Sequence, residues 1–150
     1  MKLRVPALIG MMVMVVSAAG CDEKLTDLAG PTPSLEPTFS SIQREIFNTT
    51  DSSGRAACIQ CHVAGGAAAG TGLILTEGVS YGNLVGRPSR LRPGETLVIP
   101  GDPANSYMVR KLEGGPAITG ERMPRTSGPF LTSGQMSIIR RWIAEGAANN

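Results

Sequence analysis

Two cysteines and the only histidine of the chain lie together in the segment Cys58-Ile59-Gln60-Cys61-His62. Thiols three residues apart on a helical turn face the same way, so both can reach the vinyl groups of one porphyrin. The histidine directly after the second thiol is then held under the iron and can bind it through an imidazole nitrogen. This spacing is the attachment signature of c-type haem. It predicts one covalently attached haem c, held by Cys58 and Cys61 and ligated by His62.

Other chemistries fit this segment less well. A structural zinc site needs four Cys or His ligands, but the segment supplies three, and Cys21 is the only further cysteine. A thioredoxin-type dithiol is expected in a βαβ context, whereas a polar loop over residues 48–56 precedes Cys58. A disulfide between Cys58 and Cys61 would close only a small ring and would not link distant parts of the fold. Haem attachment is therefore the favoured interpretation.

A second axial ligand must come from elsewhere, because the chain has no other histidine. Lysines and methionines are the candidates, and Met108, Met123 and Met136 are the methionines outside the first 20 residues. Met108 and Met136 fall within predicted helices, where core packing is the simpler interpretation. Met123 lies in a loop and is followed by Pro124, which fixes the local chain and cannot continue a helix. We therefore predict Met123 as the ligand, and His/Met ligation raises the reduction potential.

Two helices are predicted to frame the body that carries these residues. Residues 39–47 place apolar side chains at helical spacing, with Thr38 or Ser40 as the cap. Thr132 and Gln135 form a capping-box pattern, after which one face carries Met136, Ile139 and Ile143 until Gly146 ends the helix.

Further elements are expected between these two. Asp102-Pro103 predicts the start of another helix, because Asp caps and Pro suits the first helical position; this helix should run to Lys111 or Leu112. A short helix is expected over 76–84. Residues 86–101 indicate irregular chain with turns, apart from a weak strand over 96–99. The body is thus predicted to be all-α, with few helices joined by long loops, which an apolar cofactor would organise.

The first 20 residues have the layout of a secretory signal. Lys2 and Arg4 precede an apolar run over 5–16, and small residues follow up to Gly20. The stretch from Val5 to Gly20 is shorter than the roughly 20 residues that span a bilayer. We therefore predict a signal peptide over 1–20 and export.

The segment Ser17-Ala18-Ala19-Gly20-Cys21 resembles the lipobox of bacterial lipoproteins, although Ala18 stands where Leu is usual. The resemblance implies that Cys21 becomes a lipidated N-terminus, and two or more acyl chains make such anchoring stable. Residues 21–38 would then be the lipidated cysteine and a Pro-rich tether, followed by the body over 39–150. The expected location is the periplasmic side of a bacterial membrane.

Composition excludes several classes of protein. The 150 residues carry 14 Lys and Arg against 12 Asp and Glu, and Lys2 and Arg4 leave with the signal. The neutral remainder has no basic stripe, so we expect no nucleic-acid partner. One histidine and three cysteines cannot build a multi-site metalloenzyme or a disulfide scaffold.

The body resembles a class I, single-haem cytochrome c domain of the bacterial lipoprotein type. The resemblance covers about residues 39–147 and rests on the following motifs: Cys58–His62, Gly72-Leu73-Ile74-Leu75, Pro100-Gly101-Asp102-Pro103 with Ser106, Met123-Pro124, and Trp142-Ile143 with Gly146-Ala147. It implies a cytochrome c-like fold, in which the first and last helices pack beside the haem. The stretch 86–101 departs from the family pattern.

These observations together predict a membrane-anchored periplasmic cytochrome, not an enzyme, that passes single electrons between redox partner proteins. No nucleophile–base set or phosphate loop is present, and the only histidine is already used. Two alternatives stay open. One is a haem-based sensor or ligand-binding module in which Met123 is displaced. The other is an electron-transfer subunit of a larger redox enzyme.

Overall fold

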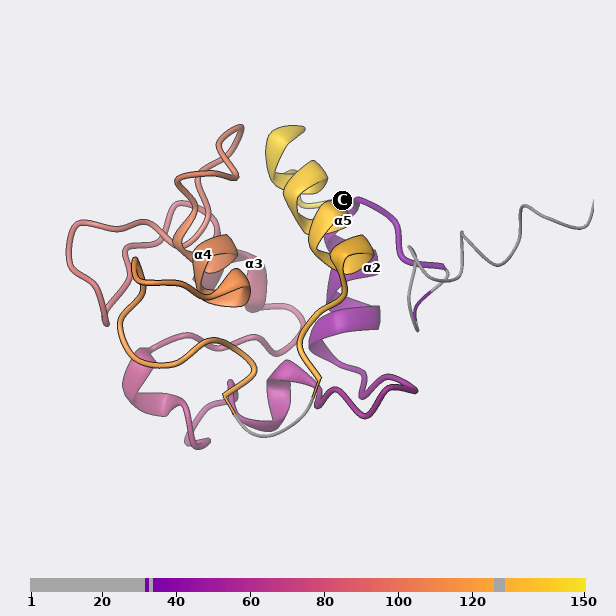
Figure 1. Cartoon of the computed structure of the whole chain (residues 1–150), viewed down its shortest axis with the longest axis horizontal. Helices are drawn as coiled ribbons and strands as arrows, with labels where there is room; N and C mark the ends of the chain where they lie inside the picture. The colour runs from indigo at the N-terminus through magenta and orange to yellow at the C-terminus, as the bar shows by residue number, and fades with distance from the viewer. Residues whose placement is uncertain (1–31, 33, 126–128) are drawn as a thin grey trace, which may run out of the picture.

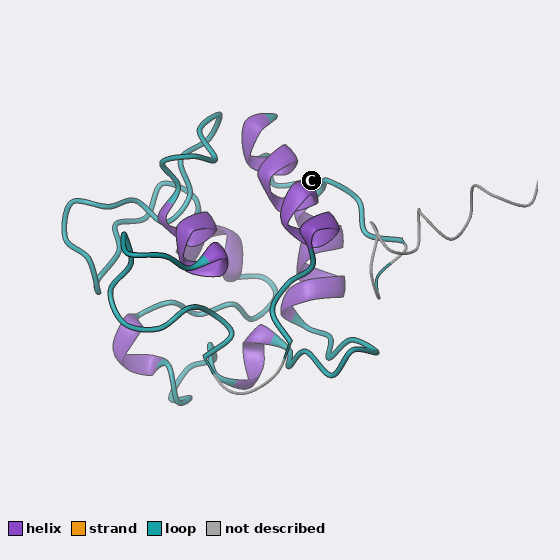
Figure 2. Cartoon of the chain, in the orientation of Figure 1, coloured by secondary structure: helices purple, strands orange, loops and turns teal. Residues whose placement is uncertain are grey.

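The computed structural model describes residue 32, residues 34–125 and residues 129–150. The predicted signal peptide and Cys21 lie outside the described residues. Every regular element of the described residues is helical (Figure 2), which confirms the all-α prediction at the level of fold class. Within the same residues, no helix is long and apolar enough to cross a membrane.

The first helical segment begins where the apolar periodicity predicted it. Helix α2 (Phe39–Ile42) continues without interruption into the π-helix η1 (Gln43–Phe47). Thr38 caps α2, since its hydroxyl accepts a hydrogen bond from the Ser41 amide. The backbone amides of Phe39 and Ser40 donate to the side chain and main chain of Asn150, so the end of the chain also satisfies this helix start.

Helix α5 (Ser133–Ala144) confirms the predicted capping box. The Thr132 hydroxyl accepts from the Gln135 amide, and the Gln135 side chain accepts from the Thr132 amide. Helices α2 and α5 lie close together (Figure 1), and the Phe39 and Trp142 rings are 5.5 Å apart between centroids. The two predicted apolar faces share one core, whose members include Phe39, Ile42, Ile46, Phe47, Met136, Ile139 and Ile143.

The prediction that a helix begins at Asp102-Pro103 is wrong. Helix α4 (Tyr107–Glu113) begins after Ser106. The Asp102 side chain accepts from the Asn105 amide and from its side chain, which closes a turn before the helix. Ser106 donates from its hydroxyl to the Asp102 carbonyl and accepts from the Ile99 amide. Asp102, which was predicted to cap the helix, therefore stabilises the turn that precedes α4.

The remaining elements are short. The 3-10 helices η2 (Cys58–Gln60) and η3 (Ala69–Thr71) precede helix α3 (Ser80–Leu84), which lies within the predicted 76–84. The weak strand predicted over 96–99 does not form; this stretch makes only isolated bridges, such as Val85 with Val98. Residues 86–101 are held to α4 by backbone bonds and by an ion pair between Glu95 and Arg110.

Part of the predicted tether packs on the body. Thr32 is buried, and Leu35 packs against the core that α2 and α5 share. The Glu36 amide donates to the Ser41 hydroxyl at 2.9 Å. Ordered contacts therefore begin before the predicted start of the body at residue 39.

Candidate haem-attachment site

The cysteine motif occupies a single tight turn. Ala57 has extended backbone angles, and Cys58 begins η2 directly after it. The backbone amides of Cys61 and His62 both donate to the Cys58 carbonyl, at 3.2 and 2.9 Å. The two cysteines and the histidine are thereby brought together on about one turn of chain.

The two thiols have different surroundings. Cys58 packs against the core, and its Sγ lies 3.6 Å from the Ile46 carbonyl oxygen of η1. Burial raises the pKa of the Cys58 thiol to about 11, and the nearby Arg55 charge opposes this shift only in part. Cys61 is exposed, and both thiols are free. One thiol therefore faces inward and the other outward.

The His62 ring is held in a fixed orientation. Its Nδ1 lies 3.2 Å from the Leu73 carbonyl oxygen, and the His62 carbonyl accepts from the Leu75 amide at 2.8 Å. A backbone carbonyl on one ring nitrogen fixes the tautomer and leaves the other nitrogen for a ligand. Burial lowers the pKa of His62, and the bond to Leu73 offsets this only in part. Burial therefore favours the neutral form of the ring, which is the form that binds a metal.

The position of Leu73 depends on a glycine. Gly72 ends η3 with a φ of +68°, a left-handed conformation that suits glycine. A Cβ at this position would also lie 2.5 Å from Nε of Arg90, which packs over the glycine. The exposed Arg90 side chain can move away, so the left-handed φ is the constraint that favours glycine immediately before the carbonyl that holds His62.

Met123 lies in the loop between α4 and α5 and is partly exposed. Its backbone amide donates to the Lys111 carbonyl at 2.9 Å. The neighbouring Arg122 donates from Nε to the Leu112 carbonyl at 2.6 Å. These two bonds fix the Met123 segment to the end of α4, and the axial role of the Met123 sulfur stays a prediction. Met108 and Met136 are buried in the core, as predicted.

Among the described residues, no group of three or more His, Cys, Asp or Glu side chains is arranged to hold a metal ion. Comparisons with protein-family models, with curated proteins and with solved structures found no match.

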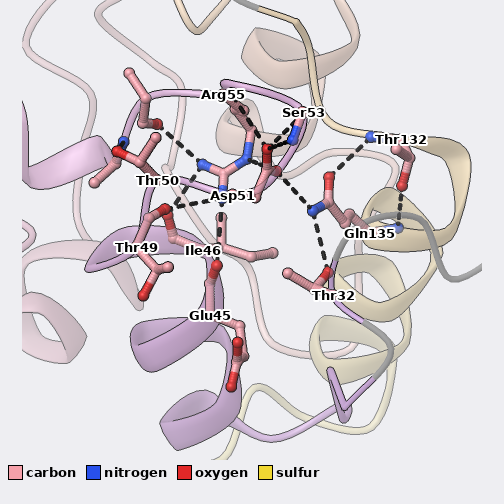
Figure 3. Close-up of polar contacts among 12 residues, drawn as sticks. Thr32, Glu45, Ile46, Thr49, Thr50, Asp51, Ser53, Arg55, Thr132 and Gln135 are labelled. Atoms are coloured by element: carbon pink, nitrogen blue, oxygen red, sulfur yellow. Dashed lines mark hydrogen bonds and ion pairs between the residues drawn. The ribbon is translucent and has the colours of Figure 1, made fainter.

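Sequence reasoning missed a buried ion pair beside the motif, between Asp51 and Arg55 (Figure 3). Arg55 is fully buried, and its Nε donates to Asp51 Oδ2 at 3.0 Å. The other guanidinium hydrogens go to backbone carbonyls at 3.1–3.3 Å, those of Glu45, Ile46, Thr49 and Ala56. All five N–H donors of the side chain are thus satisfied.

The Asp51 carboxylate is equally well satisfied. Oδ1 accepts from the Ser53 amide and hydroxyl and from the Arg55 amide. Oδ2 accepts from Arg55 and, at 3.4 Å, from the buried side chain of Gln135, which also donates to Thr32. The pair therefore ties the end of η1 to the loop before Cys58 and to the start of α5. An Asp and an Arg within a polar loop gave no sequence signal of this burial.

The Asp51 environment predicts a loss of stability in acid. Burial by itself raises the pKa of Asp51, but hydrogen bonds from Ser53, the Arg55 amide and Gln135, together with the Arg55 charge, outweigh it and hold the pKa below its usual value. A carboxyl with a lowered folded-state pKa stabilises the protein above its unfolded pKa, and this contribution disappears as the pH falls through the folded-state pKa.

We therefore expect the free energy of unfolding to fall as the pH drops below about 4. Urea titrations between pH 7 and pH 2.5 measure this effect, and the drop should be smaller in Asp51→Asn. An identical drop in that variant would show that other carboxyls are responsible.

Proposed function

We propose that this chain is an exported, lipid-anchored c-type cytochrome that carries single electrons through one haem. Cys58 and Cys61 would hold the haem through thioether bonds, and His62 would be its proximal ligand. The observation that carries the proposal is the single turn of Cys58–His62, in which the His62 ring is anchored through Nδ1 to the Leu73 carbonyl. The all-α body with long loops is consistent with a cytochrome c-like fold.

The donor set suits this cofactor. The two thiols are free to form bonds, and a neutral imidazole with one nitrogen fixed by a carbonyl is a good iron ligand. When bound, a haem supplies a one-electron iron couple whose potential the axial ligands and the surroundings set. The chain's own residues would orient His62 and hold the two thiols on one turn. The core side chains of Ile46, Leu75 and their neighbours would keep water away from the Cys58 side of the motif.

The direct test is a pyridine haemochrome assay on the full-length chain from a host that attaches c-type haem, together with its intact mass. We expect one haem per chain that stays attached after denaturation. A folded chain without haem would refute the proposal.

A second candidate is a haem-based sensor or ligand-binding module with an open sixth position. The observation in its favour is that Met123, the predicted second ligand, lies in a loop and is partly exposed. Carbon monoxide added to the reduced protein separates the two functions. Rapid binding to the wild type supports the sensor, whereas slow or absent binding supports the electron carrier.

The axial role of Met123 has its own prediction. Met123→Leu removes the sulfur but keeps the side-chain volume, so the methionine–iron band at the red end of the ferric spectrum should vanish and the reduction potential should fall. The matched control is Met136→Leu, which alters a buried core methionine and should leave the band in place. The reverse pattern would refute the assignment.

The proposed anchor is tested by Cys21→Ser. Without the thiol no acyl chains can be added, so we expect the protein to move from the membrane pellet to the soluble fraction of lysed cells. The haem content should be the same in both proteins, since Cys21 is not part of the motif. Equal membrane association of variant and wild type would contradict the lipid anchor.

A further inference from the structure

One backbone carbonyl connects the buried ion pair to the haem motif. The Ile46 oxygen accepts from Nη1 of Arg55 at 3.1 Å, and the Cys58 Sγ lies 3.6 Å from the same oxygen. Ile46 is in the last turn of η1 (Figure 3), where carbonyls lack helical partners and a cation is favourable. The Cys58 sulfur therefore contacts the same carbonyl oxygen that Arg55 binds.

The loop between η1 and Cys58 is wound around the same guanidinium. Arg55 donates to Thr49 near the start of the loop and to Ala56 near its end. The next residue, Ala57, donates its amide to the Thr50 hydroxyl at 3.3 Å. Because Cys58 follows Ala57 directly, the conformation that Arg55 imposes on this loop determines where η2 begins.

Cys61 makes none of these contacts itself. It is exposed, and its backbone bonds run to Cys58 and to Ala68. The described hydrogen bonds of Arg55 and Asp51 do not reach it. Any effect of the ion pair on thiol position should therefore fall on Cys58 and spare Cys61.

We infer that the Asp51–Arg55 pair is a positioning unit that seats the Cys58 thiol for its thioether bond. This inference rests on the proposed function. In the step concerned, the Cys58 S–H adds across one vinyl group of haem: the sulfur–carbon bond forms, the hydrogen goes to the other vinyl carbon, and no oxidant or reductant is consumed. Neither member of the pair reacts; the pair holds the sulfur where the bond can form.

The test counts thioether bonds at each cysteine. The full-length wild type, Arg55→Met and Arg55→Lys are purified from a host that attaches c-type haem, and peptide mass spectrometry gives the fraction of chains linked at Cys58 and at Cys61. We expect Arg55→Met to lose most of the link at Cys58 and to keep the link at Cys61. Lysine has three donors on one point charge and lacks the planar fork, so Arg55→Lys should not restore the Cys58 link.

A matched control separates positioning from general instability. Ile139→Ala removes a fully buried side chain from α5 and destabilises the body without removing a hydrogen bond of the pair. It should keep both thioether bonds. Equal losses at Cys58 in Ile139→Ala and Arg55→Met, or full restoration by lysine, would overturn the inference.

A wild type without haem would refute the proposed function and the thioether step with it, but the positioning of the Cys58 thiol by Arg55 can then be measured separately. In that case alkylation with iodoacetamide replaces thioether counting, because the thiolate is the reacting species and burial suppresses it at Cys58. We then expect Arg55→Met to speed alkylation of Cys58, because loss of the loop contacts exposes the thiol by more than loss of the Arg55 charge slows its ionisation, with no change at Cys61. Unchanged protection of Cys58 would overturn the inference.

Discussion

Replacing both motif cysteines, in Cys58→Ser/Cys61→Ser, should abolish covalent haem completely. Serine hydroxyls do not form the thioether bonds that the free thiols of Cys58 and Cys61 are placed to make. His62 would keep its bond to Leu73, so any haem that still enters would be held by coordination alone. After denaturation and acid–acetone extraction, all colour should leave the protein, and the intact mass should be that of the bare chain.

The control for this experiment is Cys21→Ser, which removes the remaining cysteine of the chain and should keep covalent haem at the wild-type level. The single variants add detail, since each should keep one thioether and therefore hold its haem through denaturation. Covalent haem in the double variant would exclude Cys58 and Cys61 as attachment residues.

The second large effect concerns stability. Arg55→Leu should lower the free energy of unfolding by about 3–5 kcal/mol, the usual result of removing one partner of a buried ion pair. The substitution leaves the Asp51 charge buried, and it strands the carbonyls of Glu45, Ile46, Thr49 and Ala56 without their donor. Urea unfolding followed by circular dichroism measures the change.

Two comparisons make this prediction specific. Arg125→Leu breaks an exposed pair with Glu121, in which both side chains are largely accessible, and should change stability by less than about 1 kcal/mol. The double variant Asp51→Leu/Arg55→Leu removes both charges and should recover part of the loss, because no charge is left buried alone. An Arg55→Leu effect as small as that of Arg125→Leu would show that the pair contributes little.

The sequence predicted the elements whose signals are local. Phe39, Ile42, Ile46 and Phe47 repeat at helical spacing, and the helical segment over 39–47 follows. Thr132 and Gln135 stand at the spacing of a reciprocal cap, and they form it. In both cases the residues that specify the element are close in sequence, so the pattern alone is enough.

The errors arose where the same local sequence is compatible with more than one structure. Asp102 has the chemistry of a helix cap, but Asn105 occupies its side-chain acceptors. Helix α4 begins only at Tyr107, five residues after Asp102. Arg55 is polar and lies in a polar loop, and only the fold brings the carbonyls of η1 around it. Neither the turn nor the buried guanidinium follows from periodicity, because both depend on which partners arrive from elsewhere in the chain.

Trp142 gives this body a built-in optical reporter. It is the only tryptophan of the chain, it is almost completely buried against Phe39, and its indole N–H donates to the Ala148 carbonyl. Tryptophan fluorescence therefore comes from one place, the junction between α2 and α5. A red shift in emission would mark separation of that junction without any label, and a nearby porphyrin would dim the same signal.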